Sequence, residues 1–429
     1  MLVKVINKLL FYLYMLLMLV TFNEGILQQK WAYFSDEVLL CISTLILFHN
    51  FFKLRRTVFG RPLVNLFLIY FIVQLVNFVF SPYDLKFVFT FGQALINLKA
   101  LLVPLAILLL YDQVKPTRRF VRNYLILLIV LFSIGLLLNI ILQSEWNSML
   151  GWKTEYRYGF LRMAGWFGGT HYLGYFLTLV SLVVWMGIVL KRKGRLTKRF
   201  YLSYSVFQFV LSFPLTIRKG LLSIVSLMYH NFSTGSKTKI IRLSIVSLFV
   251  VFGVYLFLGE SSYFSDTKLD ILRMTNNDDD NYYIRGLMIY NGTSLAVSHF
   301  PFGTGAATFG TVLSKYNTLE VYQKVSIPSF WYEGEELSGV YDSGFFSLLA
   351  ENGFVGIAVM ILVMIYFSKY LAARVNANGK GILDVLAITM VLWSVTEPVI
   401  QNGIFTVIYT TLIVYVVSKY KVSQSMGEV

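Results

Sequence analysis

The chain has 429 residues, of which 57% are hydrophobic and only 14% are charged, so it lacks the composition of a water-soluble globular protein. Its formal net charge is +15, a balance that would also suit a nucleic-acid-binding protein. The basic residues, however, gather in short loops between apolar stretches. This pattern indicates orientation in a membrane and gives no support to nucleic-acid binding.

About twelve apolar stretches have the length of a bilayer crossing or come close to it, because a crossing helix takes about 20 residues. Lipid offers the backbone no hydrogen-bonding partner, so the sequence predicts an all-α, polytopic integral membrane protein. The expected spans are 6–22, 37–52, 62–80, 93–111, 123–143, 170–190, 200–213, 218–231, 240–258, 345–369, 382–397 and 401–418. The spans at 200–213 and 218–231 are short, so a re-entrant pair is an alternative to two crossings.

The loops that follow even-numbered spans differ in charge from the segments on the other side of the predicted membrane. Alternate loops are basic, at Lys53–Arg56, Lys115–Arg122, Lys191–Arg199 and Lys237–Arg242. Because basic loops stay in the cytoplasm, this pattern predicts that these loops and both termini are cytoplasmic. The start of the chain has no small-residue cleavage site after its apolar run, so it is expected to be retained as the first span.

One long polar stretch, 259–342, interrupts the ladder of spans and falls on the outer side in this topology. We therefore expect a single membrane domain, 1–429, with an extracytoplasmic loop inserted between the ninth and tenth spans. Within the loop, apolar residues at helical spacing predict a helix over 282–297, and Pro301 to Gly305 predicts a tight turn. No Gly-rich phosphate loop and no cluster with zinc spacing occurs, so we expect no nucleotide, cofactor or metal.

Cations on the outer side, where positive charge is otherwise sparse, are the main candidates for a binding site. Arg157 and Arg162 precede the sixth span, Arg218 and Lys219 lie in the turn between the seventh and eighth spans, and Arg285 lies in the long loop. Each alone is as easily explained by contact with lipid headgroups. Together around one outer cavity they would suit a diphosphate, because guanidinium groups bind phosphate oxygens in pairs.

Four stretches, 162–174, 215–220, 285–309 and 342–356, are similar in residues and order to the O-antigen polymerase (Wzy-type) and O-antigen ligase superfamily of bacterial polysaccharide assembly. They contain, in turn, an arginine before a glycine-rich helix entry, an arginine in a short polar turn, an arginine helix with a Pro-Phe-Gly-Thr-Gly segment, and Asp-Ser-Gly before the next span. The resemblance covers roughly residues 155–365 and implies a membrane glycosyltransferase of the GT-C-like class. Ligases of the family usually carry a histidine where this chain has Tyr341-Asp342.

The resemblance implies transfer of a glycan from a polyprenyl diphosphate, with inversion at the anomeric carbon and without a metal or a nucleotide sugar. We expect Arg162, Arg218 and Arg285, helped by Arg157 and Lys219, to neutralise the departing diphosphate. We expect Asp342 to take the proton of the acceptor hydroxyl.

Four further residues are secondary candidates with simpler alternatives. His171 and His299 are more readily explained as structural hydrogen-bonding groups than as catalysts. Glu351 could cap a helix or pair with an arginine. Lys99 lies within the fourth predicted span, where it could either extend to the outer surface or contact lipid diphosphate.

The function expected from the sequence is polymerisation of polyprenyl-diphosphate-linked repeat units at the outer face of the bacterial cytoplasmic membrane. Its partners would be those lipid-linked oligosaccharides, the bilayer and other polysaccharide-assembly proteins. A ligase that transfers a finished glycan and a flippase for lipid-linked oligosaccharides remain as alternatives.

Overall fold

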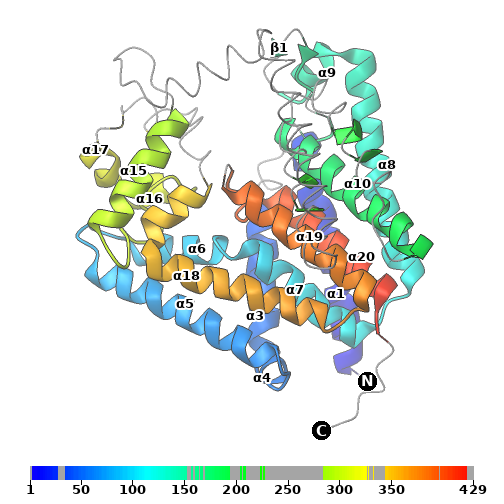
Figure 1. Ribbon diagram of the computed structural model, residues 1–429, viewed down its shortest axis with the longest axis horizontal. Coiled ribbons are helices and arrows are strands. Elements are labelled where there is room, and N and C mark those ends of the chain that lie inside the picture. The colour runs from blue at the N-terminus through cyan, green and yellow to red at the C-terminus, as the bar shows by residue number, and fades with distance from the viewer. Residues whose placement is uncertain are drawn as a thin grey trace, which may run out of the picture.

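The computed structural model describes residues 2–27, 34–151, parts of 156–167, 170–193, short pieces of 203–208 and 223–227, 284–325, 327, 332, 344–395 and 397–422. This part of the chain is helical apart from one hairpin of two-residue strands (Figure 1). Its elements are α1 (Leu2–Phe22), α2 (Glu24–Leu27), α3 (Ser35–His49), α4 (Phe51–Arg55), α5 (Gly60–Phe80), α6 (Phe87–Ile96), α7 (Lys99–Val114), α8 (Arg118–Leu142), α9 (Ser144–Met149), β1 (Tyr156–Arg157), β2 (Phe160–Leu161), α10 (Thr170–Lys193), α15 (Ile284–Ser298), α16 (Ser314–Asn317), α17 (Glu320–Lys324), α18 (Gly344–Ala372), α19 (Ala377–Ser394) and α20 (Gly403–Tyr420).

Nine of the predicted spans coincide with helices or helix pairs of this structure, and the all-α class is confirmed for the described residues. By length and composition, five helices of that part could cross a membrane: α1, α5, α8, α18 and α20. The bent pair α6 and α7 raises the number to six. The predicted spans at 200–213, 218–231 and 240–258 lie wholly or largely outside the described residues, and so do 259–283 and 333–342 of the long loop.

Helix boundaries follow from local capping residues. Thr117 accepts a hydrogen bond from the Phe120 amide at the start of α8, and Asn402 does the same for Phe405 at the start of α20. Between α7 and α8, Lys115 adopts a left-handed conformation and Pro116 follows, so the helix cannot continue. These turns lie where the hydropathy pattern predicts loops.

The fourth predicted span is not one straight helix. It consists of α6 and α7, which meet at an angle of 66° with Asn97 and Leu98 between them. The break contains neither glycine nor proline, so no local signal marks it. It is held by tertiary bonds instead: Gln401 donates to Asn97 Oδ1 at 2.9 Å, and the Ala100 amide donates to the Ile400 carbonyl at 3.2 Å.

Polar contacts gather the ends of several helices at one end of the molecule. Asp112, in α7, pairs with Arg374 just after α18 at 2.6 Å and with Lys421 just after α20 at 3.6 Å. Gln113 donates to Asn50, which follows α3, at 2.7 Å. Helices α3, α7, α18 and α20 therefore run in the same direction, as expected because they are all even-numbered spans in the predicted topology. Which end faces the cytoplasm stays a prediction.

The opposite ends of these helices lie near the segments in which the sequence predicts site residues, namely the 301–305 turn and the starts of α10 and α18. In Figure 1, α15, α16 and α17 lie together on one side, and α8, α9, α10 and β1 lie on the other, with α7, α19 and α20 between them. α5 and α18 run side by side, and α15 packs on α18. A second hydrophobic cluster, which includes Met288, Leu295, Phe309 and Tyr322, fixes α15 and α17 to this end.

Candidate functional site

The tight turn predicted at Pro301 to Gly305 docks on a break in α18. Gly353 has φ of 59° and ψ of −170° inside that helix, so the helical hydrogen bonds are interrupted there. The turn supplies substitutes: the Thr304 amide donates to the Ala350 carbonyl at 2.9 Å, and the Val355 amide donates to the Pro301 carbonyl at 3.2 Å. Two stretches that carry the family resemblance, 285–309 and 342–356, are thus one structural unit.

Glu351 is fully buried at this break. Its Oε1 accepts hydrogen bonds from the amides of Thr308 (2.8 Å) and Phe309 (3.0 Å) and from the Thr311 hydroxyl (2.5 Å). The alternative in which Glu351 pairs with an arginine is not seen among the described residues, where its partners are main-chain and hydroxyl groups. Glu351 therefore shapes the 301–311 turn.

His299 lies at the end of α15, beside the same turn. Its Nδ1 is 3.0 Å from the Leu295 carbonyl and 3.0 Å from Ser298 Oγ, and its Nε2 is 3.4 Å from the Tyr83 hydroxyl. Both ring nitrogens thus have partners within the protein, which is the geometry expected of a structural hydrogen-bonding group.

A second group of polar residues surrounds the segment between α19 and α20. Glu397 accepts a hydrogen bond from the Tyr175 hydroxyl of α10. The first residue of α18, Gly344, touches the same segment, since a Cβ placed on it would lie 2.3 Å from the Glu397 carbonyl oxygen. His171 lies one turn before Tyr175, with its ring 3.9 Å from that of Tyr172. The start of α10, the start of α18 and residues 397–403 therefore meet, and we call this region the 397–403 junction.

Lys99 belongs to the same junction and is not exposed. It is the first residue of α7, is 2% exposed, and its Nζ lies 2.5 Å from Asp36 Oδ2. Asp36 in turn touches Gly403, at the start of α20. The Lys99 ammonium is paired inside the protein. The expectation that its side chain extends to the outer surface is therefore wrong.

Glu24, in α2 just outside α1, lies close to Asp36. Burial raises the pKa of Glu24 to about 8, and the nearby Asp36 carboxylate adds to the rise.

Among the predicted diphosphate ligands, only Arg162 has a described side chain. It is half-buried after β2, and its carbonyl accepts a hydrogen bond from Asn147 at 2.8 Å. The hairpin pairs Arg157 of β1 with Phe160 of β2, and Arg162 directly follows β2. The backbone of Arg285 lies in the first turn of α15. Arg218, Lys219 and the expected base Asp342 lie outside the described residues, and the convergence of the arginines stays a prediction.

Two polar features near the starts of α7 and α18 were not identified from the sequence. One is the Lys99–Asp36 pair; the other is a buried network of amides, in which Gln93 donates to Asn97 at 2.8 Å and Gln74 donates to Asn352 at 2.7 Å. Polar residues spaced four apart inside apolar spans, such as Gln93 and Asn97, are the signal that would have indicated it.

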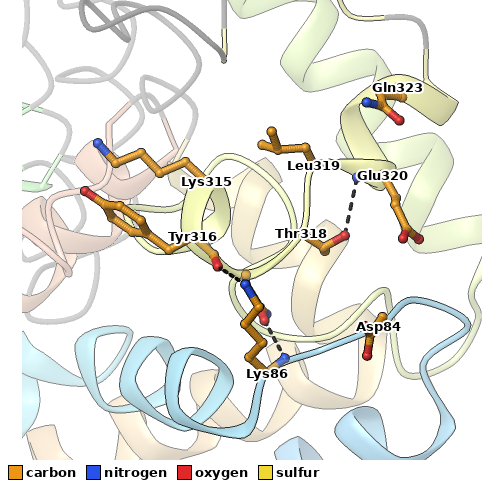
Figure 2. Close-up of a pocket in the computed structure, with 9 residues that line it drawn as sticks. Asp84, Lys86, Lys315, Tyr316, Thr318, Leu319, Glu320 and Gln323 are labelled. Carbon is orange, nitrogen blue, oxygen red and sulfur yellow. Dashed lines mark hydrogen bonds between the residues drawn. The ribbon is translucent and has the colours of Figure 1, made fainter.

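A surface hollow of about 400 Å³ lies beside α16 and α17. Figure 2 shows Lys86 beneath α16, where its Nζ donates to the Tyr316 carbonyl at 3.1 Å and its amide donates to Asn317 Oδ1 at 2.6 Å. None of the predicted site residues that the structure describes lines this hollow. Among the described residues, no three His, Cys, Asp or Glu side chains are placed to hold a metal ion together.

Compared with known proteins, the chain matches no family model and no curated sequence. The resemblance of the four stretches to the polymerase and ligase superfamily therefore stays an expectation from the sequence.

Proposed function

We propose that the protein is a polysaccharide polymerase that joins polyprenyl-diphosphate-linked repeat units on the outer side of the bacterial cytoplasmic membrane. The observation that carries the proposal is the docking of the 301–311 turn on the break of α18 around Glu351. Two family-like stretches far apart in the sequence meet there, as parts of one site would.

The start of α18 links this unit to the rest of the proposed site. Asp342 precedes Gly344 by two residues, and Gly344 packs on the 397–403 junction, where α10 also begins. The hairpin that holds Arg157 and Arg162 leads into α10. The proposed base and two of the proposed diphosphate ligands are thus adjacent in sequence to helices that meet at one junction.

In the proposed reaction, an acceptor hydroxyl attacks the anomeric carbon of the donor sugar while the bond from that carbon to the diphosphate oxygen breaks. Asp342 takes the hydroxyl proton, and the electron pair leaves with the diphosphate. Arg162, Arg218 and Arg285 stabilise the charge that grows on the leaving group, an effect worth about 10²–10³ in rate for one well-placed donor.

The test is elongation by the purified chain in proteoliposomes that contain polyprenyl-diphosphate-linked repeats. A ladder of longer lipid-linked products is expected. Movement of the repeat across the bilayer without elongation would instead establish the flippase, and transfer of long chains to a different acceptor would establish the ligase.

Variants assign the roles. Asp342→Asn is expected to lower the elongation rate by about 10²–10⁴, the usual contribution of a general base. Asp84→Asn is the matched control, because Asp84 is an exposed carboxylate at the same end of the molecule. If the two variants elongated at similar rates, Asp342 would not be the base.

A further inference from the structure

Three side-chain oxygens at the break in α18 have no hydrogen-bond partner in the described part of the chain: Gln74 Oε1, Asn77 Oδ1 and Glu351 Oε2. Gln74 and Glu351 are fully buried, and Asn77 is 2% exposed. Most buried polar atoms in proteins are paired, and in lipid the cost of leaving one unpaired is greater. Three unpaired acceptors in one region therefore indicate that a donor or a cation binds there.

The orientation of the two amides follows from their hydrogen bonds. Asn352 Nδ2 donates to the Leu348 carbonyl at 2.8 Å, so Asn352 Oδ1 faces Gln74 and can only accept. Gln74 must then turn its Nε2 toward Asn352, which leaves its oxygen unpaired. Asn77 Nδ2 donates to the Phe302 carbonyl at 2.9 Å, which likewise leaves Oδ1 unpaired. Exchanging O and N in either amide would place two acceptors against each other.

The three side chains are anchored to neighbouring segments: Gln74 donates to Asn352, Asn77 donates to the Phe302 carbonyl, and Glu351 accepts from the amides of the 301–311 turn. Gln74 and Asn77 lie one turn apart on α5, and Gln74 binds the residue that follows Glu351. Gly305 lies between Asn77 and Glu351: its amide donates to the Glu351 carbonyl at 2.9 Å, and a Cβ placed on it would be 3.9 Å from the Asn77 carbonyl oxygen. The junction of α5, the 301–311 turn and α18 thus contains all three.

In its ionised form, a carboxylate as deeply buried as Glu351 requires a positive partner, because the cost of burying a bare charge is large. No lysine or arginine forms an ion pair with Glu351 among the described residues. A proton on Glu351 would satisfy Oε2 and at most one further oxygen. A cation bound at this junction would supply a partner to oxygens of several side chains, and a single charge balances the single carboxylate, whereas a divalent ion would leave an excess of positive charge.

We propose that Glu351, Gln74 and Asn77 bind a monovalent alkali-metal cation, which fixes the 301–311 turn to the break of α18. Oxygen atoms of carboxylates and amides are the ligands that hard cations prefer. The sequence predicts no metal because it contains no zinc-type spacing, and a site made from one carboxylate and two amides leaves no such spacing. This inference does not depend on the proposed glycosyl transfer.

The test is thermal unfolding of the purified full-length chain in detergent at constant ionic strength, with Li⁺, Na⁺ or K⁺ replacing choline. A saturable rise in Tm of a few degrees is expected with at least one of the three ions, because a ligand that binds only the folded state stabilises it. Equal Tm values in all four salts would overturn the proposal and indicate that a proton or water serves these oxygens.

Two variants connect any ion effect to this site. Glu351→Gln removes the charge and places an amide NH₂ where Oε2 lies, so the ion response is expected to disappear. Gln74→Met removes one oxygen at similar length and is expected to weaken ion affinity by about tenfold or more. Gln401→Met is the matched control, since it also loses a buried hydrogen bond but removes none of the three oxygens.

Binding of radioactive ²²Na⁺ to the unmodified chain gives an answer that does not depend on the folding of any variant. If Na⁺ is the ion that raises Tm, saturable binding is expected. An ion response that persists in Glu351→Gln would place the cation elsewhere and contradict the proposal. Elongation activity is not used as the readout, so failure of either proposal leaves the other independently testable.

Discussion

At the scale of single residues, Lys99 and Asp36 form the most deeply buried ion pair of the described residues, with side chains 3% and 13% exposed. Taking two charges out of water has a cost that their attraction only partly offsets, so such a pair contributes little net stability. Removing one partner is different, because the remaining charge stays buried without compensation.

We therefore expect Lys99→Met to lower the free energy of unfolding by about 3–5 kcal/mol. The double variant Lys99→Met, Asp36→Leu should recover most of that loss, since no bare charge remains. Thermal or denaturant unfolding in detergent measures both. Lys53→Met, at an exposed lysine, is the control and should change stability by less than about 0.5 kcal/mol. Unchanged stability in Lys99→Met would contradict the assigned pairing.

At the scale of helices, the break of α18 depends on Gly353. Its φ of 59° is a conformation that residues with a Cβ seldom adopt, and a Cβ there would lie 2.3 Å from the Phe302 carbonyl carbon and 2.4 Å from the Pro301 oxygen. Gly151 has a similar φ of 69° but no atom within 4 Å of its Cβ position. The two glycines therefore have similar φ angles but differ in their contact with neighbouring backbone.

Gly151→Ala should cost about 1–2 kcal/mol, the usual penalty of the left-handed conformation. Gly353→Ala should cost clearly more, because the added methyl group must also push the 301–305 turn away from α18. Tm values of the two variants measure the two losses, and limited proteolysis between α15 and α17 shows whether the turn has moved away from α18. Equal losses in the two variants would mean that the turn does not pack against the break as described.

Helix positions could be predicted from the sequence, whereas helix breaks could not. Runs of apolar residues predicted spans where α1, α5, α8, α10, α18, α19 and α20 occur, because burial in lipid requires apolar length. The bend at Asn97 was missed because its cause is the distant Gln401, and the break at Gly353 was missed because apolar neighbours on both sides hide a single Asn-Gly pair. Glu351 was identified as a candidate, but its amide partners 40 or more residues away could not be inferred from spacing.

At the scale of the whole molecule, the ion pairs of Asp112 and the pair of Lys99 with Asp36 mark two opposite ends of the helix bundle. The basic loops Lys53–Arg56 and Lys115–Arg122 adjoin the Asp112 end, while the 301–311 turn packs on the opposite portions of α5 and α18. If basic loops face the cytoplasm, the proposed glycosyl-transfer site and the proposed cation site both face outward.

Cysteine labelling in intact cells tests this orientation. With Cys41→Ser as background, we expect Tyr316→Cys and Gln323→Cys, on α16 and α17, to react with a membrane-impermeant maleimide added outside. Val58→Cys and Val422→Cys, at the Asp112 end, should react only after the membrane is permeabilised. All four positions are exposed and uncharged, so every basic residue that sets the orientation is retained. The reverse labelling pattern would place the 301–311 turn in the cytoplasm, where an acceptor chain growing outside the cell could not reach it, and the proposed polymerase would have to be abandoned.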